Sequence, residues 1–402
     1  MKITDIRLER LSGQLSSDLP LFEGRVLRPI DVYPEHRAEG SEVMSAGRFS
    51  PSIETKDSGK WQITGTFVFV DTDDGITGLA GPGHAGEANF IKTQLRHLLI
   101  GEDPLATERV WDKMYRHLIH GRKGEPMFAV SLVDCALWDI RGKASSMPLY
   151  RMLGGPTRKS IPAYASALGF PIGPDQAAEQ AKRFVSDGYT ATKWFVRDGP
   201  MDGEIGKDRN VELIAAIREA VGPDVEIMVD AWNSWDVRYT LDMAKRLEEY
   251  RPRWLEEVVK PDDISGYARV RQASPIRISG GEHEYTRWGA REYFEKGAVD
   301  VYQADTLWAG GISEMIKIAA LASAYEVELI PHGASVPINA AITAAQSPPT
   351  SPYIEYLVQW NEMSQFFFKN PIKPVDGMVT VAELPGLGIE IDEDKVDSRE
   401  SL

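Results

Sequence analysis

The stretch VEIMVDAW, residues 225–232, carries Asp230 at the end of an apolar run, and two similar stretches follow it along the chain. They are PRWLEEVV, with Glu256, and PIRISGGEHE, with Glu282, and each acidic residue comes 26 positions after the one before. This interval suits one strand followed by one helix, so the three residues should occupy equivalent places in successive β/α units. In a parallel barrel those places are the C-terminal strand ends, where active sites are built.

The same alternation of strand-like and helix-like segments extends in both directions from these stretches. The short apolar segments that we expect to be strands are IPAYASA, TATKWFV, VEIMVDAW, RWLEEVV, IRISGGE, VDVYQAD, VELIPHG and YIEYLV. Amphipathic segments of helical period lie between them, which favours short crossovers and a closed barrel. An open, doubly wound sheet is the alternative, but it normally offers one crevice rather than a ring of equivalent strand ends.

The chain before the barrel pattern is organised differently. Residues 1–11 and 61–80 alternate like strands, and DDG at 73–75 is a strong hairpin turn. Residues 12–60 read as a long loop, either a lid over the barrel or a surface segment without fixed structure. Residues 86–153 have helical periodicity, so this part is predicted to be a separate α+β domain.

Composition excludes several classes of function. The formal charge of −15 argues against nucleic acid or an anionic membrane as a partner. No apolar run is long enough to span a bilayer, and the N-terminus lacks the apolar stretch of a signal peptide. The single cysteine, Cys135, lies in an apolar helical pattern, which indicates core packing rather than a nucleophile. We therefore expect a cytoplasmic protein.

Polar residues stand at the end of almost every expected strand. Besides the three acids, they are Lys193, Asp305, His332 and Glu355. Each has an ordinary explanation, such as a helix cap for Asp305, a buried core histidine for His332 or half of an ion pair for Glu355. Three carboxylates at one rim repel one another unless a cation neutralises them, and oxygen-only ligation suits Mg²⁺ best. The sequence therefore predicts a metal-dependent enzyme with one Mg²⁺ in its site.

Several motifs resemble the enolase superfamily, in particular its mandelate racemase subgroup. They are the passage ALWDIRGKA…PLYRMLGG, SGGEHE, QADTLWAGG, PHGAS and the tail PVDGMVTV…LPGLGIEI. Within that subgroup the chain is most similar to the rhamnonate dehydratase group of acid-sugar dehydratases. The resemblance implies a modified TIM barrel, (β/α)7β, with an N-terminal α+β capping domain. The expected division is a capping domain over 1–157, a catalytic barrel over 158–360 and a segment, 361–402, that returns to the capping domain.

The resemblance also implies roles for the residues at the strand ends. It makes Asp230, Glu256 and Glu282 the Mg²⁺ ligands, with Glu256 rather than the adjacent Glu257 in that role. The other implied roles are a catalytic base for His332, its orienting carboxylate for Asp305, a hydrogen bond to the substrate carboxylate for Glu355 and a catalytic cation for Lys193.

One departure from the racemase pattern bears on mechanism. Racemases of the subgroup carry Lys-x-Lys on the second strand, whereas here Phe195 replaces the second lysine. With one base, His332, the chemistry expected is elimination: His332 removes the C2 proton of an acid sugar and then protonates the departing 3-hydroxyl, while Lys193 and a protonated Glu355 stabilise the enediolate. A racemase, epimerase or cycloisomerase is the alternative, and a binding protein without activity is a third reading.

Substrate contacts are predicted less directly. Our candidates are His283, Trp308, His36 and Arg48. His283 could instead orient Glu282, Trp308 could be core packing, and the two loop residues could be ordinary surface positions. The expected substrate is a small-molecule sugar acid such as L-rhamnonate, L-mannonate or L-lyxonate, and the resemblance implies a homo-oligomer.

Overall fold

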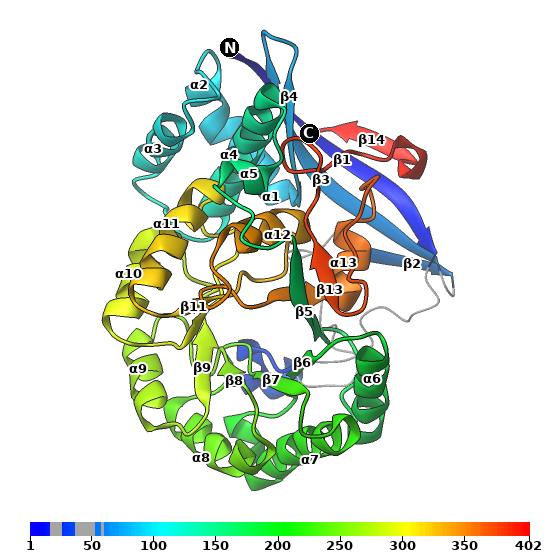
Figure 1. Ribbon diagram of the computed structural model, residues 1–402, viewed down its shortest axis with the longest axis vertical. Helices are drawn as coiled ribbons and strands as arrows, with labels where there is room; N and C mark the ends of the chain where they lie inside the picture. The colour runs from blue at the N-terminus through cyan, green and yellow to red at the C-terminus, as the bar shows by residue number, and fades with distance from the viewer. Residues whose placement is uncertain (17–25, 37–52, 58–59) are drawn as a thin grey trace.

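An antiparallel sheet and a curled parallel sheet make up the two halves of the molecule (Figure 1). The computed structural model describes residues 1–16, 26–36, 53–57 and 60–402. The antiparallel sheet has the order β14-β1-β3-β2, with β4 also paired to β3. Its strands are β1 (Ile3–Ser16), β2 (Ile53–Asp57), β3 (Lys60–Thr72), β4 (Thr77–Gly83) and β14 (Ser398–Ser401). Both chain termini therefore belong to this half.

Helices cover one face of the antiparallel sheet. They are α1 (Ala85–Phe90), α2 (Arg96–Leu99), α3 (Thr107–His117), α4 (Glu125–Ser145) and α5 (Leu149–Met152). Helix α4 is buried on most sides and approaches β4 so closely that a Cβ at Gly78 would lie 2.2 Å from the carbonyl oxygen of Ala136. Only glycine permits this contact. The expected hairpin is confirmed, because residues 73–76 join β3 to the antiparallel β4 and Gly75 has φ +78°.

The second half of the molecule is a barrel of alternating strands and helices. In residues 160–357 the parallel strands are β5 (Ser160–Ser166), β6 (Ala191–Phe195), β7 (Glu226–Asp230), β8 (Trp254–Glu256), β9 (Arg277–Gly280), β10 (Val301–Tyr302), β11 (Glu328–Leu329) and β12 (Ile354–Leu357). The helices between them are α6 (Pro174–Ser186), α7 (Gly203–Val221), α8 (Val237–Leu247), α9 (Ile264–Ala273), α10 (Thr286–Glu295), α11 (Ile312–Ala324) and α12 (Val336–Ala345). The short α13 (Val358–Ser364) follows β12. The predicted (β/α)7β barrel with its capping half is confirmed.

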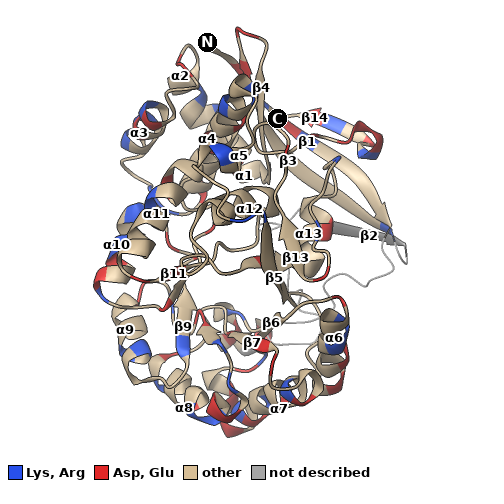
Figure 2. Ribbon diagram, in the orientation of Figure 1, with Lys and Arg blue, Asp and Glu red and all other residues tan. Residues whose placement is uncertain are grey.

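The curled sheet ends at β11 on one side and β12 on the other. The segment just before β12 bonds to β11 instead: the Leu329 N–H donates to Thr350 O at 2.7 Å, and Ser351 Oγ donates to Leu329 O at 2.6 Å. The polar residues that follow the strands therefore gather at one end of the barrel, which we call the rim. Figure 2 shows charged residues of both signs on the outer barrel helices, as expected for solvent-facing surfaces.

The structure corrects parts of the expected boundaries. Strand β1 continues to Ser16 instead of ending at residue 11, and β2 lies within the expected 12–60 loop, because both pair with β3. Strands β10 and β11 are only two residues long, since the chain leaves the ladder before Asp305 and His332.

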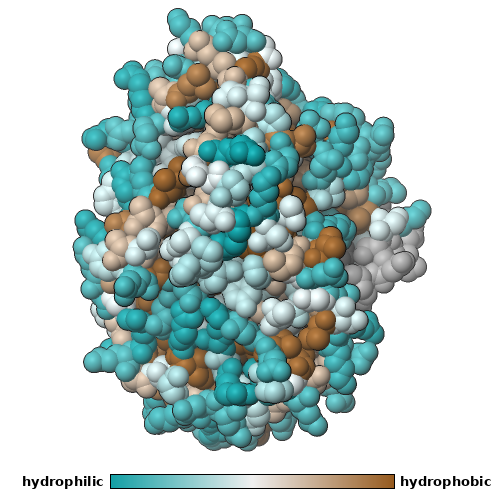
Figure 3. Space-filling view, viewed as in Figure 1, coloured by the Kyte–Doolittle hydropathy of each residue, from teal (hydrophilic) through white to brown (hydrophobic). Residues whose placement is uncertain are grey.

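No helix among the described residues is long and apolar enough to cross a membrane. Hydrophobic residues on the face in Figure 3 form small, separate patches.

The C-terminal segment contacts both halves. Strand β13 (Met378–Thr380) pairs antiparallel with the barrel strand β5, and β14 pairs with β1. Between them the Leu387 N–H donates to Asp139 Oδ1 on α4 at 2.9 Å. The segment thus links the capping half to the barrel. The domain boundaries at residues 157 and 360 remain a prediction.

Candidate active site

Lys193 lies inside the barrel among three carboxylates. Its side chain on β6 is 1% exposed, and Nζ lies 2.5 Å from Glu256 Oε1, 2.8 Å from Glu355 Oε1 and 3.0 Å from Asp230 Oδ2. Burial alone would lower the pKa of the Lys193 ammonium, but Glu256, Glu355 and Asp230 raise it well above its usual range. The charged ammonium therefore holds four strand ends together.

The surroundings of Glu355 favour its ionised form. Burial opposes its charge, but Lys193 and His332 together hold the pKa of the carboxyl below its usual value. The Gly333 N–H also donates to Glu355 Oε2 at 2.9 Å. The cation and the backbone donor beside the carboxyl therefore favour the carboxylate over the protonated Glu355 that was expected to donate to the substrate.

Asp230 and Glu256 end the neighbouring strands β7 and β8, and Glu282 follows β9; all three are buried near the rim. The Asp230 Oδ1 atom accepts from the Trp232 N–H at 2.9 Å, and Glu256 Oε2 accepts from the Trp254 indole at 2.8 Å. Burial raises the pKa of Asp230 to about 6 and that of Glu256 to about 8. Burial, reinforced by Glu257, also raises the pKa of Glu282 to about 8. A cation beside these oxygens would relieve the desolvation, so the donor set fits a hard divalent ion.

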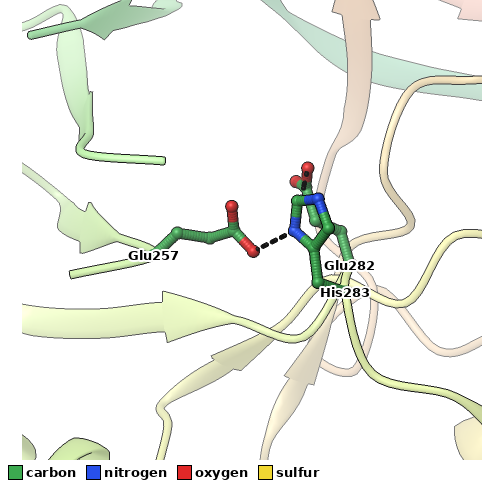
Figure 4. A group of neighbouring side chains, drawn as sticks. All are labelled: Glu257, Glu282 and His283. Carbon is green, nitrogen blue, oxygen red and sulfur yellow. Dashed lines mark hydrogen bonds and ion pairs between the residues drawn. The ribbon is translucent and has the colours of Figure 1, made fainter. Parts of the chain in front are cut away.

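A second cluster at the rim joins Glu257, Glu282 and His283 (Figure 4), whose potential ligand atoms lie within 4.8 Å of one another. His283 Nδ1 is 2.7 Å from Glu257 Oε1, and Asn233 Nδ2 donates to Glu257 Oε2 at 2.7 Å. Burial would lower the pKa of His283, but Glu257 raises it to about 9. Glu257 has φ +48°, a left-handed conformation that turns its side chain to the rim instead of the outer face.

His332 and Asp305 form a hydrogen-bonded pair. His332 Nδ1 is 2.7 Å from Asp305 Oδ2, and Asp305 Oδ1 accepts from the Leu307 N–H at 2.7 Å. The other ring nitrogen, Nε2, is 3.8 Å from Glu282 Oε2. Burial would lower the pKa of His332, but Glu282 and the Asp305 hydrogen bond raise it to about 10. The ring is thus oriented through Nδ1, and its Nε2 faces the acidic cluster.

Five of these groups, Lys193, Asp230, Glu282, His283 and His332, line one cavity of about 530 Å³, part of it open to solvent. Glu256, Glu257, Asp305 and Glu355 are not among its lining residues. Its walls are partly apolar, since Phe195, Trp308 and Trp360 line it beside the charged groups. The Trp308 ring centroid lies 4.9 Å from that of His332 and 5.8 Å from that of His283. The remaining lining residues are Leu168, Trp232 and Leu357.

The structure does not bring every candidate residue to this cavity. His36 is not among its lining residues, and its carbonyl oxygen accepts from Arg28 Nη2 at 2.9 Å. Arg48 lies outside the described residues. Trp360, by contrast, was not predicted; it follows β12 on α13, and no motif or spacing around it signals a site. For Glu257, the one indication in the sequence of a place in the site was the repeated Glu in EEVV.

Fold and site together define a class of protein: a (β/α)7β barrel enzyme with a capping domain and an acidic, histidine-containing rim. Comparison with known families agrees. Residues 176–395 match the family described as "Enolase C-terminal domain-like", and residues 57–154 match "Mandelate racemase / muconate lactonizing enzyme, N-terminal domain". The chain therefore belongs to the mandelate racemase/muconate lactonizing enzyme family of the enolase superfamily.

The relatives are named for different activities. The chain is 34% identical over 380 residues to an L-rhamnonate dehydratase of Saccharopolyspora erythraea, covering 92% of this chain and 90% of the relative. It is 36% identical over 345 residues to a D-galactarolactone cycloisomerase of Agrobacterium fabrum, covering 81% and 89%. The structure of rhamnonate dehydratase from Gibberella zeae complexed with Mg is similar with a TM-score of 0.82 and 30% identity, covering 98% of this chain and 96% of that one.

Proposed function

We propose that this enzyme dehydrates an acid sugar, an aldonate such as L-rhamnonate, L-mannonate or L-lyxonate, to a 2-keto-3-deoxy acid. The observation that carries the proposal is one His–Asp pair, His332 with Asp305, in a cavity whose β6 position for a second base is the apolar Phe195. One base suits an elimination in which the same ring accepts and returns a proton. The rhamnonate dehydratases among the relatives support this choice.

We infer that Mg²⁺ is held by Asp230, Glu256 and Glu282. The support is that all three are buried carboxylates at or just after the ends of consecutive strands, and that the Lys193 ammonium already contacts two of them as a cation. The Glu257–Glu282–His283 cluster is the competing set, but a histidine nitrogen suits Mg²⁺ less well than an all-oxygen set. When bound, the ion stabilises negative charge that develops on the substrate carboxylate.

The protein side chains account for the proton transfers. His332 Nε2 takes the C2 proton while Asp305 fixes the ring through Nδ1. The Lys193 ammonium stabilises the resulting enediolate, and Glu355 holds that ammonium in place. The imidazolium then returns its proton to the 3-hydroxyl as the C3–O bond breaks, water leaves, and the enol becomes the ketone.

The test is to incubate the protein and Mg²⁺ with five- and six-carbon aldonic and aldaric acids and to assay 2-keto-3-deoxy product. Product from acids of a single C2/C3 configuration is expected. The absence of product from every acid, together with the absence of C2 deuterium exchange in D₂O, would overturn the proposal.

Cycloisomerisation is the second candidate, because a D-galactarolactone cycloisomerase is 36% identical over 345 residues. It shares the removal of a C2 proton but yields no 2-keto-3-deoxy acid from an open-chain aldonate. Exchange of the C2 proton for deuterium without keto product, or conversion of a sugar-acid lactone, would favour this activity or a racemase over dehydration.

A further inference from the structure

A second cavity adjoins the active-site cavity, and we call it the side pocket. It comprises about 460 Å³, part of it open to solvent, between the capping half and the barrel. Trp308 and Trp360 line both cavities. The side pocket therefore begins beside His332, whose ring centroid is 4.9 Å from that of Trp308. The two indoles form the shared wall of the cavities, so a ligand that reached beyond them would enter the side pocket.

Two donors in the side pocket lack a partner. Ser364 and Trp360 line it and are 3% and 9% exposed, and neither Ser364 Oγ nor Trp360 Nε1 has a hydrogen-bond partner in the part of the chain that the structure describes. Both are on α13, directly after the strand that carries Glu355. Buried polar atoms are normally paired, so these two point to a ligand that supplies hydrogen-bonding groups.

The other side of the pocket is polar without a positive charge. His84 and Glu87 face it from the start of α1, where the His84 N–H donates to Glu87 Oε2. Burial lowers the pKa of His84 to about 4 and raises that of Glu87 to about 7, so the imidazole is neutral. No lysine or arginine is among the lining residues that the structure describes.

Apolar side chains complete the lining. Phe128 on α4 and Trp308 on the β10–α11 connection face the pocket, and their ring centroids are 5.5 Å apart. Aromatic faces pack well against the C–H groups of a sugar, while neutral hydrogen-bonding groups recognise its hydroxyls. A carboxylate placed here would be desolvated beside Glu87 with no cation among the described residues to compensate.

We propose that the side pocket binds the uncharged, hydroxyl-bearing end of a six-carbon aldonate, and that it makes the enzyme select aldonates over aldarates, which end in a second carboxylate. Ser364 and Trp360 are the specificity-determining residues. This inference rests on the proposed function, since it assumes that an acid sugar occupies the neighbouring cavity with its carboxylate end.

The test uses Ser364→Ala and Trp360→Phe, which remove one donor each and keep most of the side-chain volume. Each is expected to raise KM and Kd for a six-carbon aldonate about 3- to 10-fold, the effect of one uncharged hydrogen bond, with little change in kcat. Ser364 lines only the side pocket, so a four-carbon aldonate should not reach it, and Ser364→Ala should leave the constants of that substrate unchanged. Ser323→Ala, an exposed serine on α11, and Trp288→Phe, on the outer surface, are the matched controls.

Binding is measured separately from turnover, by calorimetry with the Mg²⁺-loaded protein and with its His332→Asn variant. Weaker binding of the six-carbon aldonate to Ser364→Ala supports the side pocket even if no acid sugar is dehydrated, in which case only the proposed function fails. Normal dehydration with unchanged KM in both α13 variants, or equal affinity for aldonate and aldarate, would overturn the side pocket and leave the function standing. The absence of binding by any acid sugar would overturn both.

A gain of charge provides a second test that does not depend on loss of a contact. His84→Arg places a guanidinium in the side pocket and should raise the ratio of aldarate to aldonate affinity at least 10-fold. An unchanged ratio in a variant with the melting temperature of the parent would contradict the proposed selection.

Discussion

At the scale of single residues, the site depends on the side-chain contacts of Lys193 and Glu282. Lys193 contacts Asp230, Glu256 and Glu355, and Glu282 faces both His283 and His332. The spacing in the sequence predicted that most of these residues lie at strand ends, but it did not predict which side chains pair with one another. The charge state of Glu355, for example, follows from an ammonium at 2.8 Å that lies more than 160 positions away in the sequence.

The first prediction concerns His332. His332→Asn keeps a side chain of similar size but removes the base, so kcat for dehydration should fall by about 10³-fold or more. Because Asp305 holds the ring, and Nε2 comes no nearer than 3.8 Å to the proposed ligand Glu282, stabilisation by Mg²⁺ in a thermal melt should persist. Substantial residual dehydration, or loss of the Mg²⁺ response, would contradict the assignment.

A residue-scale prediction separates the two candidate ligand sets. Glu256→Gln should weaken Mg²⁺ binding about 10-fold or more, measured by calorimetry, because it removes a proposed ligand. Glu257→Gln is the matched variant, one position along, and should bind Mg²⁺ nearly as the parent does. The reverse pattern would assign the ion to the Glu257–Glu282–His283 cluster.

At the scale of elements, α4 joins the capping half to the barrel helix α11. Asp134 on α4 accepts from the Ser313 N–H at 2.9 Å and from Ser313 Oγ at 2.6 Å, and thereby caps the N-terminus of α11. Trp138 Nε1 donates to the same Ser313 Oγ at 2.9 Å, and Trp111 Nε1 donates to Gly310 O at 2.8 Å. Sequence patterns predicted both helices, but not these contacts, since 179 residues separate Asp134 from its partner.

Asp134→Ala should lower the free energy of unfolding by about 3 kcal/mol, because two buried donors of Ser313 lose their acceptor. Urea unfolding monitored by circular dichroism measures this loss. A normal midpoint would show that the cap contributes nothing.

The same carboxyl predicts a pH dependence. Burial raises the pKa of Asp134 from 3.8 to about 7, so between these values the folded protein binds more protons at this site than the unfolded chain. Its contribution to stability is therefore largest at low pH and falls as pH rises through this window. In Asp134→Asn that part of the pH dependence should disappear. Asp224→Asn, at an exposed turn, is the control and should retain it.

At the scale of the whole molecule, the buried acids make the barrel half sensitive to divalent cations. Mg²⁺ at 100 times its Kd should stabilise the folded protein by about 2.7 kcal/mol, and a chelator should reverse the gain. Thermal melts with Mg²⁺, with a chelator and with Asp230→Asn test this. An equal melting temperature in the parent with and without Mg²⁺ would argue against the proposed metal site.

Local pattern alone determined much of this protein. The 26-residue interval between Asp230, Glu256 and Glu282 predicted β/α units, and the confirmed barrel brings the strand ends to one rim because parallel strands all point the same way. The DDG turn and the helix α4 could likewise be predicted, because hairpin turns and helical periodicity depend on residues that are close together in the sequence.

Tertiary structure alone decided which groups touch. It gave Glu257 a positive φ, placed Glu355 beside the Lys193 ammonium, and placed Trp360 in the walls of both the active-site cavity and the side pocket. These outcomes depend on contacts between residues far apart in sequence and on local dielectric, and neither leaves a periodic signal in the chain.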